Sequence, residues 1–312
     1  MDCFFRLGIL RLIGMNIQRT LLFQPQIQVV QLEKLRPHGN KYYKLHPNLQ
    51  AAHEQGFDRI VSFGGAWSNH ILALAEMAAA QSLQGVGVIR GEQPASLSAT
   101  LSEARALGMH LHFVARSEYH HRRDPAFVSK IEKLYGHCNI IPEGGSNILA
   151  VQGCQEIVKD IEKVCPDYDV IVLPVGTGGT IAGIASALPA GKRVIGISVL
   201  KGAGYLDTEI RQLLASAAAK IDVCAAALDG SNWSVDHRFH EGGYAKVSAA
   251  LKSFILEVEH RSALRLDPVY TGKMLLAVTR LIDSGEIRAS EKVLALHTGG
   301  SQGRRGFTWL PA

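Results

Sequence analysis

Apolar segments of strand length alternate with longer helical patterns through most of this chain, and this alternation restricts the fold more than any other feature. Residues 59–63 (RIVSF) and 85–91 (GVGVIRG) predict buried strands, and residues 68–83 between them predict a helix rich in alanine and leucine. The same order recurs where 168–176 (YDVIVLPVG) precedes 178–188 (GGTIAGIASAL). Buried strands separated by helices are typical of parallel sheets covered on both faces. The sequence therefore predicts an α/β fold.

The alternation falls into two series, each long enough to form its own open parallel sheet. No linker rich in proline, glycine or serine separates them, and no internal repeat is visible. We expect a small α/β domain at 46–148 and a large α/β domain formed by 15–45 together with 149–312.

The amino-terminal segment MDCFFRLGILRLIGMNIQ resembles a signal peptide only superficially. Arg6 and Arg11 interrupt its apolar run, and no cleavage site of small residues follows. Met15 is an alternative start, so we expect residues 1–14 to be an extension outside the fold. No run of 18 apolar residues occurs elsewhere, and we expect no membrane span.

Charge and cysteine usage exclude several classes of partner. The formal charge of +5 is modest, and the basic runs at 120–124 and 303–306 accompany no nucleic-acid motif. The five cysteines form no C-x-x-C pair, which argues against a zinc site and a disulfide framework. We expect no metal, no nucleic acid and a cytoplasmic location.

Three turns rich in glycine and hydroxyl groups follow predicted strands, at 62–70, 175–180 and 296–303. Ligands of open parallel sheets bind at the carboxyl ends of the strands. The turn at 175–180 (VGTGGT) can hold a phosphate on converging backbone N–H groups at a helix start. Ile181 stands where a dinucleotide fingerprint requires glycine, so a single phosphate is favoured over a pyrophosphate. The alternative is a turn chosen only for tight packing.

Two further features have both a structural and a functional interpretation. Ser68, Asn69 and His70 begin a predicted helix, where free N–H groups suit a carboxylate, although serine and asparagine also cap helices routinely. Lys41 and Lys44 lie in GNKYYKL, and either is a surface charge or a nucleophile whose surroundings lower its pKa.

A reactive lysine, a site for one phosphate and a helix start for a carboxylate describe pyridoxal phosphate chemistry. The chain resembles the fold-type-II pyridoxal phosphate enzymes, which are related to the tryptophan synthase β chain and place the active site between two α/β domains. More narrowly, it resembles the family of 1-aminocyclopropane-1-carboxylate deaminase and D-cysteine desulfhydrase. The matching segments, in the family's order, are GNKYYKL, SFGGAWSNH, PEGGSN, VGTGGT, DPVYTGK and LHTGGSQG.

The resemblance implies roles for individual residues. The cofactor-bearing lysine of the family follows Gly-Asn directly, so it matches Lys41 and not Lys44. The serine near the substrate matches Ser68, and the asparagine that contacts the cofactor's ring oxygen matches Asn69. The other implied residues are those of the phosphate turn, the two active-site tyrosines and the threonine facing the pyridine nitrogen: Gly176, Thr177, Gly178, Gly179, Thr180, Tyr270, Tyr244 and Thr298. Replacing Gly178 with valine is expected to lower cofactor affinity while the fold is kept.

The departures from the family pattern bear on the reaction. The segment before Lys41 is shorter than in many members, and His70 stands where deaminases carry glutamine. Deaminases also carry a glutamate after the active-site tyrosine, where this chain has Thr271. Neutral hydroxyls at Thr271 and Thr298 favour β-elimination of a small amino acid, as in D-cysteine desulfhydrase.

Other activities stay open at this point. They are deamination of 1-aminocyclopropane-1-carboxylate, racemisation, β-replacement, and cofactor binding without turnover. The resemblance also implies a homodimer.

Overall fold

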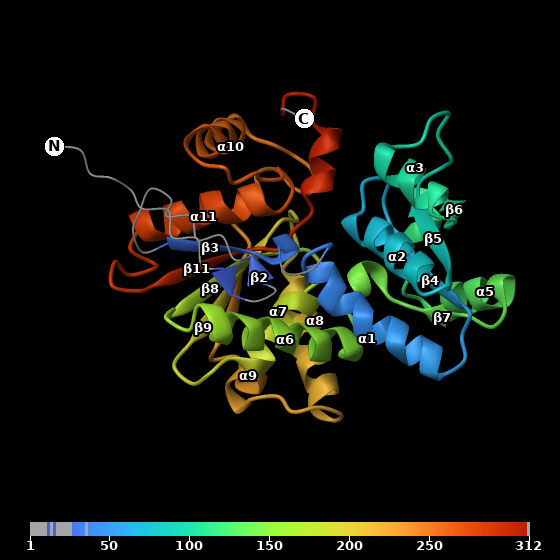
Figure 1. The fold of residues 1–312 in the computed structure, drawn as a ribbon, viewed down its shortest axis with the longest axis horizontal. Coiled ribbons are helices and arrows are strands. Elements are labelled where there is room, and N and C mark those ends of the chain that lie inside the picture. The colour runs from blue at the N-terminus through green and yellow to red at the C-terminus, as the bar shows by residue number, and fades with distance from the viewer. Residues whose placement is uncertain (1–10, 13–14, 17–26, 35–36, 311–312) are drawn as a thin grey trace.

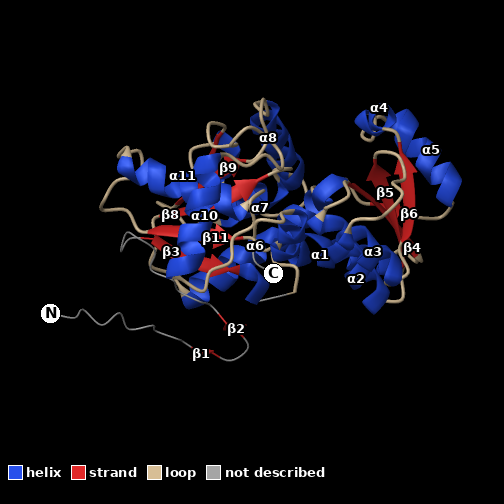
Figure 2. Cartoon of the chain, turned by 90° about the horizontal axis from the view of Figure 1, so that it is seen from above, coloured by secondary structure: helices blue, strands red, loops and turns tan. Residues whose placement is uncertain are grey.

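The structure is a computed structural model that describes residues 11–12, 15–16, 27–34 and 37–310. It contains two parallel sheets (Figures 1 and 2). The five-stranded sheet has the order β10-β9-β8-β11-β3, and the four-stranded sheet has the order β6-β5-β4-β7. The strands of the larger sheet are β3 (Ile27–Gln31), β8 (Val170–Val175), β9 (Arg193–Ser198), β10 (Trp233–Asp236) and β11 (Val293–His297). Those of the smaller sheet are β4 (Arg59–Gly64), β5 (Gln84–Arg90), β6 (His110–Val114) and β7 (Asn139–Ile140).

Helices cover both faces of each sheet, as apolar strands require. They are α1 (Asn40–Glu54), α2 (Asn69–Ala80), α3 (Ala99–Ala106), α4 (Arg116–His120), α5 (Pro125–Tyr135), α6 (Ile148–Val164), α7 (Gly179–Ala187), α8 (Tyr205–Ala218), α9 (Ala225–Asp229), α10 (Ala249–Arg261) and α11 (Thr271–Asp283). Short 3₁₀ turns lie at Leu32–Lys34 (η1), Glu143–Gly145 (η2) and Ser301–Gly306 (η3).

The central strand β8 shows why strands that are apolar at every position predict a sheet with helices on both faces. Val170 and Val172 pack into the core beneath α10 and α11, whereas Ile171 and Leu173 pack into the core formed with α6, α7 and α8. Successive strand residues point to opposite faces, so a strand that is apolar at every position must be buried on both. The helices lie on opposite sides of the larger sheet in Figure 1.

Helix α1 links the two sheets and packs closely on α6. Pro47 lies inside α1 and has no N–H that could donate to the carbonyl of Tyr43, four residues earlier. Gly153 of α6 lies against this carbonyl, and a Cβ there would come 1.9 Å from its oxygen. The missing side chain therefore lets α6 approach the face of α1 next to the phosphate turn.

The two predicted series each form their own sheet, but the strand at the edge of the larger sheet comes from the amino-terminal segment. Strand β3 pairs in parallel with β11, with Ile27 beside Val293 and Gln31 beside His297. The domain limits themselves stay a prediction, and α1 runs across the expected boundary at 45/46.

Most of the predicted extension at 1–14 lies outside the described residues. The exception is Arg11–Leu12 (β1), which pairs with Met15–Asn16 (β2) in a two-stranded antiparallel ribbon. Among the helices of the described ranges, none combines the length and the apolar character needed to cross a membrane.

Candidate active site

One cavity of about 300 Å³ lies at the carboxyl ends of the strands of both sheets. Every site residue chosen from the sequence lines it, although these residues come from segments far apart in the chain. They are Lys41, Ser68, Asn69, His70, Gly176, Thr177, Gly178, Gly179, Thr180, Tyr244, Tyr270 and Thr298.

The start of α1 is seated on the loop that follows β11. Gly39 has a φ of +55°, and a Cβ there would come 2.2 Å from the carbonyl oxygen of Thr298. The same oxygen accepts a 3.0 Å hydrogen bond from the backbone N–H of Asn40. Glycine is needed at this position because of both the positive φ and the close approach. The Gly-Asn pair thus positions the next residue, Lys41, over the cavity.

Lys41 has few partners and a lowered pKa. Its Nζ donates a 2.9 Å hydrogen bond to Oδ1 of Asn40, whose Nδ2 in turn donates to Oγ1 of Thr180 at 2.9 Å. Burial lowers the pKa of Lys41 to about 8, although Cys154 and Asp267 oppose the shift. A lysine with such a pKa has a substantial unprotonated fraction near neutral pH and can act as a nucleophile or a base.

Lys44 lies one turn further along α1 and points into the phosphate turn. Its Nζ donates to Oγ of Ser146 at 2.8 Å and lies 3.4 Å from Oγ1 of Thr177. Burial, followed by the charge of Lys41, lowers the pKa of Lys44 to about 7. The family motif assigned no role to Lys44 or to Ser146. In the sequence, the i, i+3 spacing of the two lysines was the signal that could have indicated a role for Lys44, because it puts both on one helix face.

The turn at 176–180 lines the cavity at the start of α7. A Cβ on Gly179 would lie 2.7 Å from Oγ of Ser146 and 3.0 Å from Nζ of Lys44. Gly178 caps the helix with a φ of +76°, and a Cβ there would instead meet Cγ1 of Ile210 at 2.8 Å. The space over Gly179 therefore has an ammonium group, two hydroxyls and a helix amino end around it, which suits one phosphate.

The residues at the start of α2 occupy different environments. Oγ of Ser68 accepts from the N–H of Ile71 at 3.2 Å and so caps the helix, while its side chain also lines the cavity. Oδ1 of Asn69 accepts a hydrogen bond from Nε2 of Gln302.

His70 is a buried part of the cavity wall, and its Nε2 lies 2.8 Å from Oγ of Ser62. Burial, then Lys44 and Lys41, lowers the pKa of His70 well below its usual value, so the ring is neutral at physiological pH. Its Nδ1 is buried and has no hydrogen-bond partner among the described residues. The binding of a carboxylate by the free N–H groups at this helix start stays a prediction.

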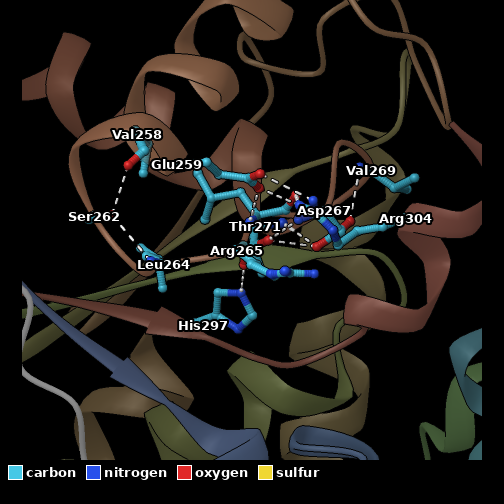
Figure 3. Close-up of polar contacts among 11 residues, drawn as sticks. Val258, Glu259, Ser262, Leu264, Arg265, Asp267, Val269, Thr271, His297 and Arg304 are labelled. Carbon is cyan, nitrogen blue, oxygen red and sulfur yellow. Dashed lines mark hydrogen bonds and ion pairs between the residues drawn. The ribbon is translucent and has the colours of Figure 1, made fainter. Parts of the chain in front are cut away.

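Tyr270 directly precedes α11 and is held by Asp267, whose contacts with Val269 and Thr271 are drawn in Figure 3. Asp267 accepts hydrogen bonds from the N–H groups of Val269, Tyr270 and Thr271 at 2.9, 2.7 and 2.9 Å. Burial raises the pKa of Tyr270 well above its usual value, and Tyr244, whose ring centroid is 6.1 Å away, adds to this effect. The phenol of Tyr270 is therefore a proton donor at neutral pH.

Thr271 does not line the cavity, contrary to what its place after the active-site tyrosine predicted. Its Oγ1 donates to Oδ2 of Asp267 at 2.6 Å and accepts from the N–H of Asp267 at 2.9 Å, and the residue is fully buried. Thr298 is thus the one of the two threonines that faces the cavity.

The comparison with known proteins decides the family. The sequence pattern of the family described as pyridoxal-phosphate dependent enzyme matches residues 26–299. This chain belongs to that family.

Several of the similar proteins belong to the narrower group that the motifs indicated. The bifunctional D-cysteine desulfhydrase/1-aminocyclopropane-1-carboxylate deaminase, mitochondrial, of Arabidopsis thaliana is 30% identical over 286 residues, which cover 85% of this chain and 69% of that protein. A D-cysteine desulfhydrase of Salmonella newport is 26% identical over 274 residues, with 84% of this chain and 82% of that protein covered. A crystal structure of an ACC deaminase homologue has a TM-score of 0.75 at 25% identity and covers 89% of this chain and 85% of its own. The predicted fold-type-II class is confirmed.

The cavity of this pyridoxal phosphate enzyme fits its cofactor on chemical grounds. The space over Gly179 accepts one phosphate, and an amine of lowered pKa, Lys41, extends from the same helix as the lysine at that space. Within the described parts of the chain, no group of three or more His, Cys, Asp or Glu side chains could hold a metal ion. The cysteines in those parts form no disulfide with one another; they are Cys138, Cys154, Cys165 and Cys224.

Proposed function

We propose that this enzyme is a lyase that acts on a small amino acid by β-elimination, as D-cysteine desulfhydrase does, and releases a keto acid and ammonia. The observation that carries the proposal is the pairing of Lys41 and Lys44 on one face of α1. One amine is tied only to its neighbour Asn40, and the other lies in the phosphate turn. In this proposal Lys41 holds the cofactor aldehyde, and Lys44 with Ser146 and residues 176–180 holds its phosphate.

Further residues would orient the cofactor ring and the substrate. Asn69 would contact the ring oxygen, and Thr298 would donate a hydrogen bond to the pyridine nitrogen. The start of α2 at Ser68 and Asn69 would bind the substrate carboxylate, since a helix amino end favours an anion. We include His70 as a neutral neighbour of this carboxylate site, through Nδ1.

The bound cofactor supplies an electron sink for the bond that breaks. Once the substrate amine has displaced it from the cofactor, Lys41 would take the α-proton, a role that its lowered pKa suits, and Ser68 would assist. Tyr270, with its raised pKa, would keep its proton until it is given to the leaving group, and Tyr244 would cover the site beside it.

Deamination of 1-aminocyclopropane-1-carboxylate is the second candidate, because a bifunctional relative carries out both reactions by name. Elimination is favoured here because the residue that lines the cavity directly after β11 is a threonine, Thr298, rather than a carboxylate. A neutral hydroxyl supports a milder electron sink, which suffices when a good leaving group is present. Racemisation and β-replacement would need the same residues and stay open as alternatives.

We also propose a cytoplasmic homodimer. The free thiols of the described cysteines suit a reducing compartment. The dimer follows from the resemblance to the family alone.

Two measurements test the proposed function. Borohydride reduction of the cofactor-loaded protein, followed by peptide mapping, should place the cofactor on Lys41; a label on Lys44, or none, contradicts the assignment. A side-by-side assay should then show keto acid released from D-cysteine. Turnover of 1-aminocyclopropane-1-carboxylate without turnover of D-cysteine would favour the deaminase instead.

A further inference from the structure

A second cavity of about 520 Å³ adjoins the first. The two share walls at Gly65, Asn69, Arg90, Tyr244 and Tyr270. A substrate bound with its carboxylate at the start of α2 therefore has a space next to it into which a side chain can extend.

Two arginines line this second cavity. Arg90 ends β5, and Val114, its partner in the neighbouring strand β6, lies two positions before Arg116, the first residue of α4. Nη2 of Arg90 lies 3.6 Å from the point that a Cβ on Gly65 would occupy, so the guanidinium lies over the turn that leads to Ser68. Among the described residues, neither arginine has a hydrogen-bond or ion-pair partner.

The other arginines near the cavities are neutralised, which makes the first two distinctive. Nε of Arg122 donates to Glu143 at 2.6 Å, and Arg123 forms an ion pair with Glu209. The one carboxylate on the wall of the second cavity, that of Asp267, already accepts bonds from three backbone N–H groups and a hydroxyl.

The carboxylates that line the two cavities are thus engaged by other groups, and Arg90 and Arg116, which are both exposed to solvent, have no ion-pair partner among the described residues. Arginine presents a planar fork of donors that matches carboxylate, sulfonate and phosphate oxygens.

We propose that Arg90 and Arg116 form a subsite for an anionic group on the side chain of the amino acid substrate. The inference rests on the proposed function and specifies its substrate class. In the elimination, the bond from the β-carbon to a sulfonate or phosphate ester group breaks, and the group leaves with the bonding electron pair as sulfite or phosphate. The α-proton goes to the base, and water then releases pyruvate and ammonia.

The competing role for Arg90 is recognition of the α-carboxylate that every amino acid carries. The two roles differ in what they discriminate, because only the subsite distinguishes amino acids by the charge of the side chain. Aspartate and asparagine form a matched pair for this test, since they have the same shape and neither has a leaving group for elimination.

The experiment uses the cofactor-loaded protein, with loading checked by visible absorbance. Calorimetric titration with both enantiomers of aspartate and asparagine measures binding, and keto acid release from cysteate and O-phosphoserine against cysteine and serine measures turnover. We expect the anionic compounds to be preferred in at least one enantiomeric series. Arg90→Gln should weaken their binding about 10- to 100-fold, with little effect on asparagine.

Arg90→Lys, which keeps the charge, should restore part of the preference, and Arg105→Gln on the exposed face of α3 is the control for loss of one surface charge. Arg116→Gln should have a smaller effect of the same sign. Equal affinity for aspartate and asparagine, or an equal loss for both in Arg90→Gln, overturns the subsite. Keto acid release from neutral substrates alone overturns the subsite but leaves the lyase proposal in place. A cofactor-loaded protein that neither binds nor turns over any compound of the panel contradicts both the subsite and the lyase proposal.

Discussion

Nζ of Lys273 donates a 2.7 Å hydrogen bond to the carbonyl oxygen of Gly243, which ties a fully buried residue of α11 to the loop that carries Tyr244. This loop has positive φ angles at Glu241 (52°), Gly242 (98°), Gly243 (119°) and Ala245 (57°). Such backbone persists only where its surroundings hold it. A buried ammonium group is costly, so its hydrogen bond to this loop points to a role in positioning Tyr244.

Replacing Lys273 with methionine should therefore show whether this residue positions Tyr244 or only stabilises the folded protein. The variant loses the bond to Gly243 but also the cost of a buried charge, so we expect a melting temperature close to that of the wild type. With Tyr244 misplaced, kcat should fall about 10- to 100-fold while cofactor affinity is kept. Lys220→Met, at an exposed position, is the control. An unchanged kcat would show that the loop holds its shape without Lys273.

The lowered pKa of Lys41 predicts how cofactor capture depends on pH. Only the unprotonated amine attacks an aldehyde, and burial lowers the pKa of Lys41 from 10.5 to about 8. The rate of capture by the cofactor-free protein should rise up to about pH 8 and then level off. The rate is measured by absorbance after rapid mixing. Dividing it by the rate with a free lysine derivative at the same pH corrects for the effect of the cofactor's own ionisation. A rate that still climbs toward pH 10 would contradict the assignment.

Lys44 should make the unfolding free energy of the cofactor-free protein depend on pH. Its pKa is about 7 in the folded protein and takes its ordinary value of 10.5 in the unfolded chain, so between these values the unfolded chain binds more protons. Stability should therefore rise with pH through this window. Urea unfolding from pH 7 to pH 9.5 should show a shallower rise in Lys44→Met than in the wild type or Lys220→Met. If the unfolding free energy rises equally with pH in Lys44→Met and in the wild type, folding does not lower the pKa of Lys44.

The two central glycines of the phosphate turn should respond differently to substitution. Gly179→Ala places a methyl group against Oγ of Ser146 and Nζ of Lys44, so we expect loss of cofactor affinity with the fold kept. Gly178→Val, which the sequence suggested for this purpose, combines a φ of +76° with a contact to Ile210, and should instead lower the melting temperature. Fluorescence titration with cofactor and thermal unfolding distinguish the two. Full cofactor affinity in Gly179→Ala would place the phosphate elsewhere.

Substitutions at Thr271 and Thr298 should likewise have different effects, one on stability and the other on the absorbance of the cofactor. Thr271→Val removes a buried hydroxyl that both donates to and accepts from Asp267, and should cost about 1–3 kcal/mol of unfolding free energy. Thr298→Val should leave stability nearly unchanged but shift the visible absorbance of the bound cofactor, because its hydroxyl faces the cavity. Denaturant unfolding and absorbance spectra measure the two effects. An absorbance shift in Thr271→Val alone would reverse the assignment.

The amino-acid sequence alone was enough to predict the α/β class, the separation into two parallel sheets and the segments that surround the cavity. These follow from local signals: strands that are apolar at every position, and glycine turns that must lie at the carboxyl ends of such strands. The resemblance to the family likewise pointed to Lys41, because the family's cofactor-bearing lysine directly follows Gly-Asn, and this role stays a prediction.

Which polar groups meet depends instead on the tertiary structure. The fold brings Lys44 and Ser146 together at the phosphate turn, directs the hydroxyl of Thr271 toward Asp267, and leaves Arg90 uncompensated while Arg122 meets Glu143. These outcomes depend on side-chain direction and on contacts between residues far apart in the chain. A motif specifies neither, because the same residue can face a cavity or its own backbone with little change in local propensity.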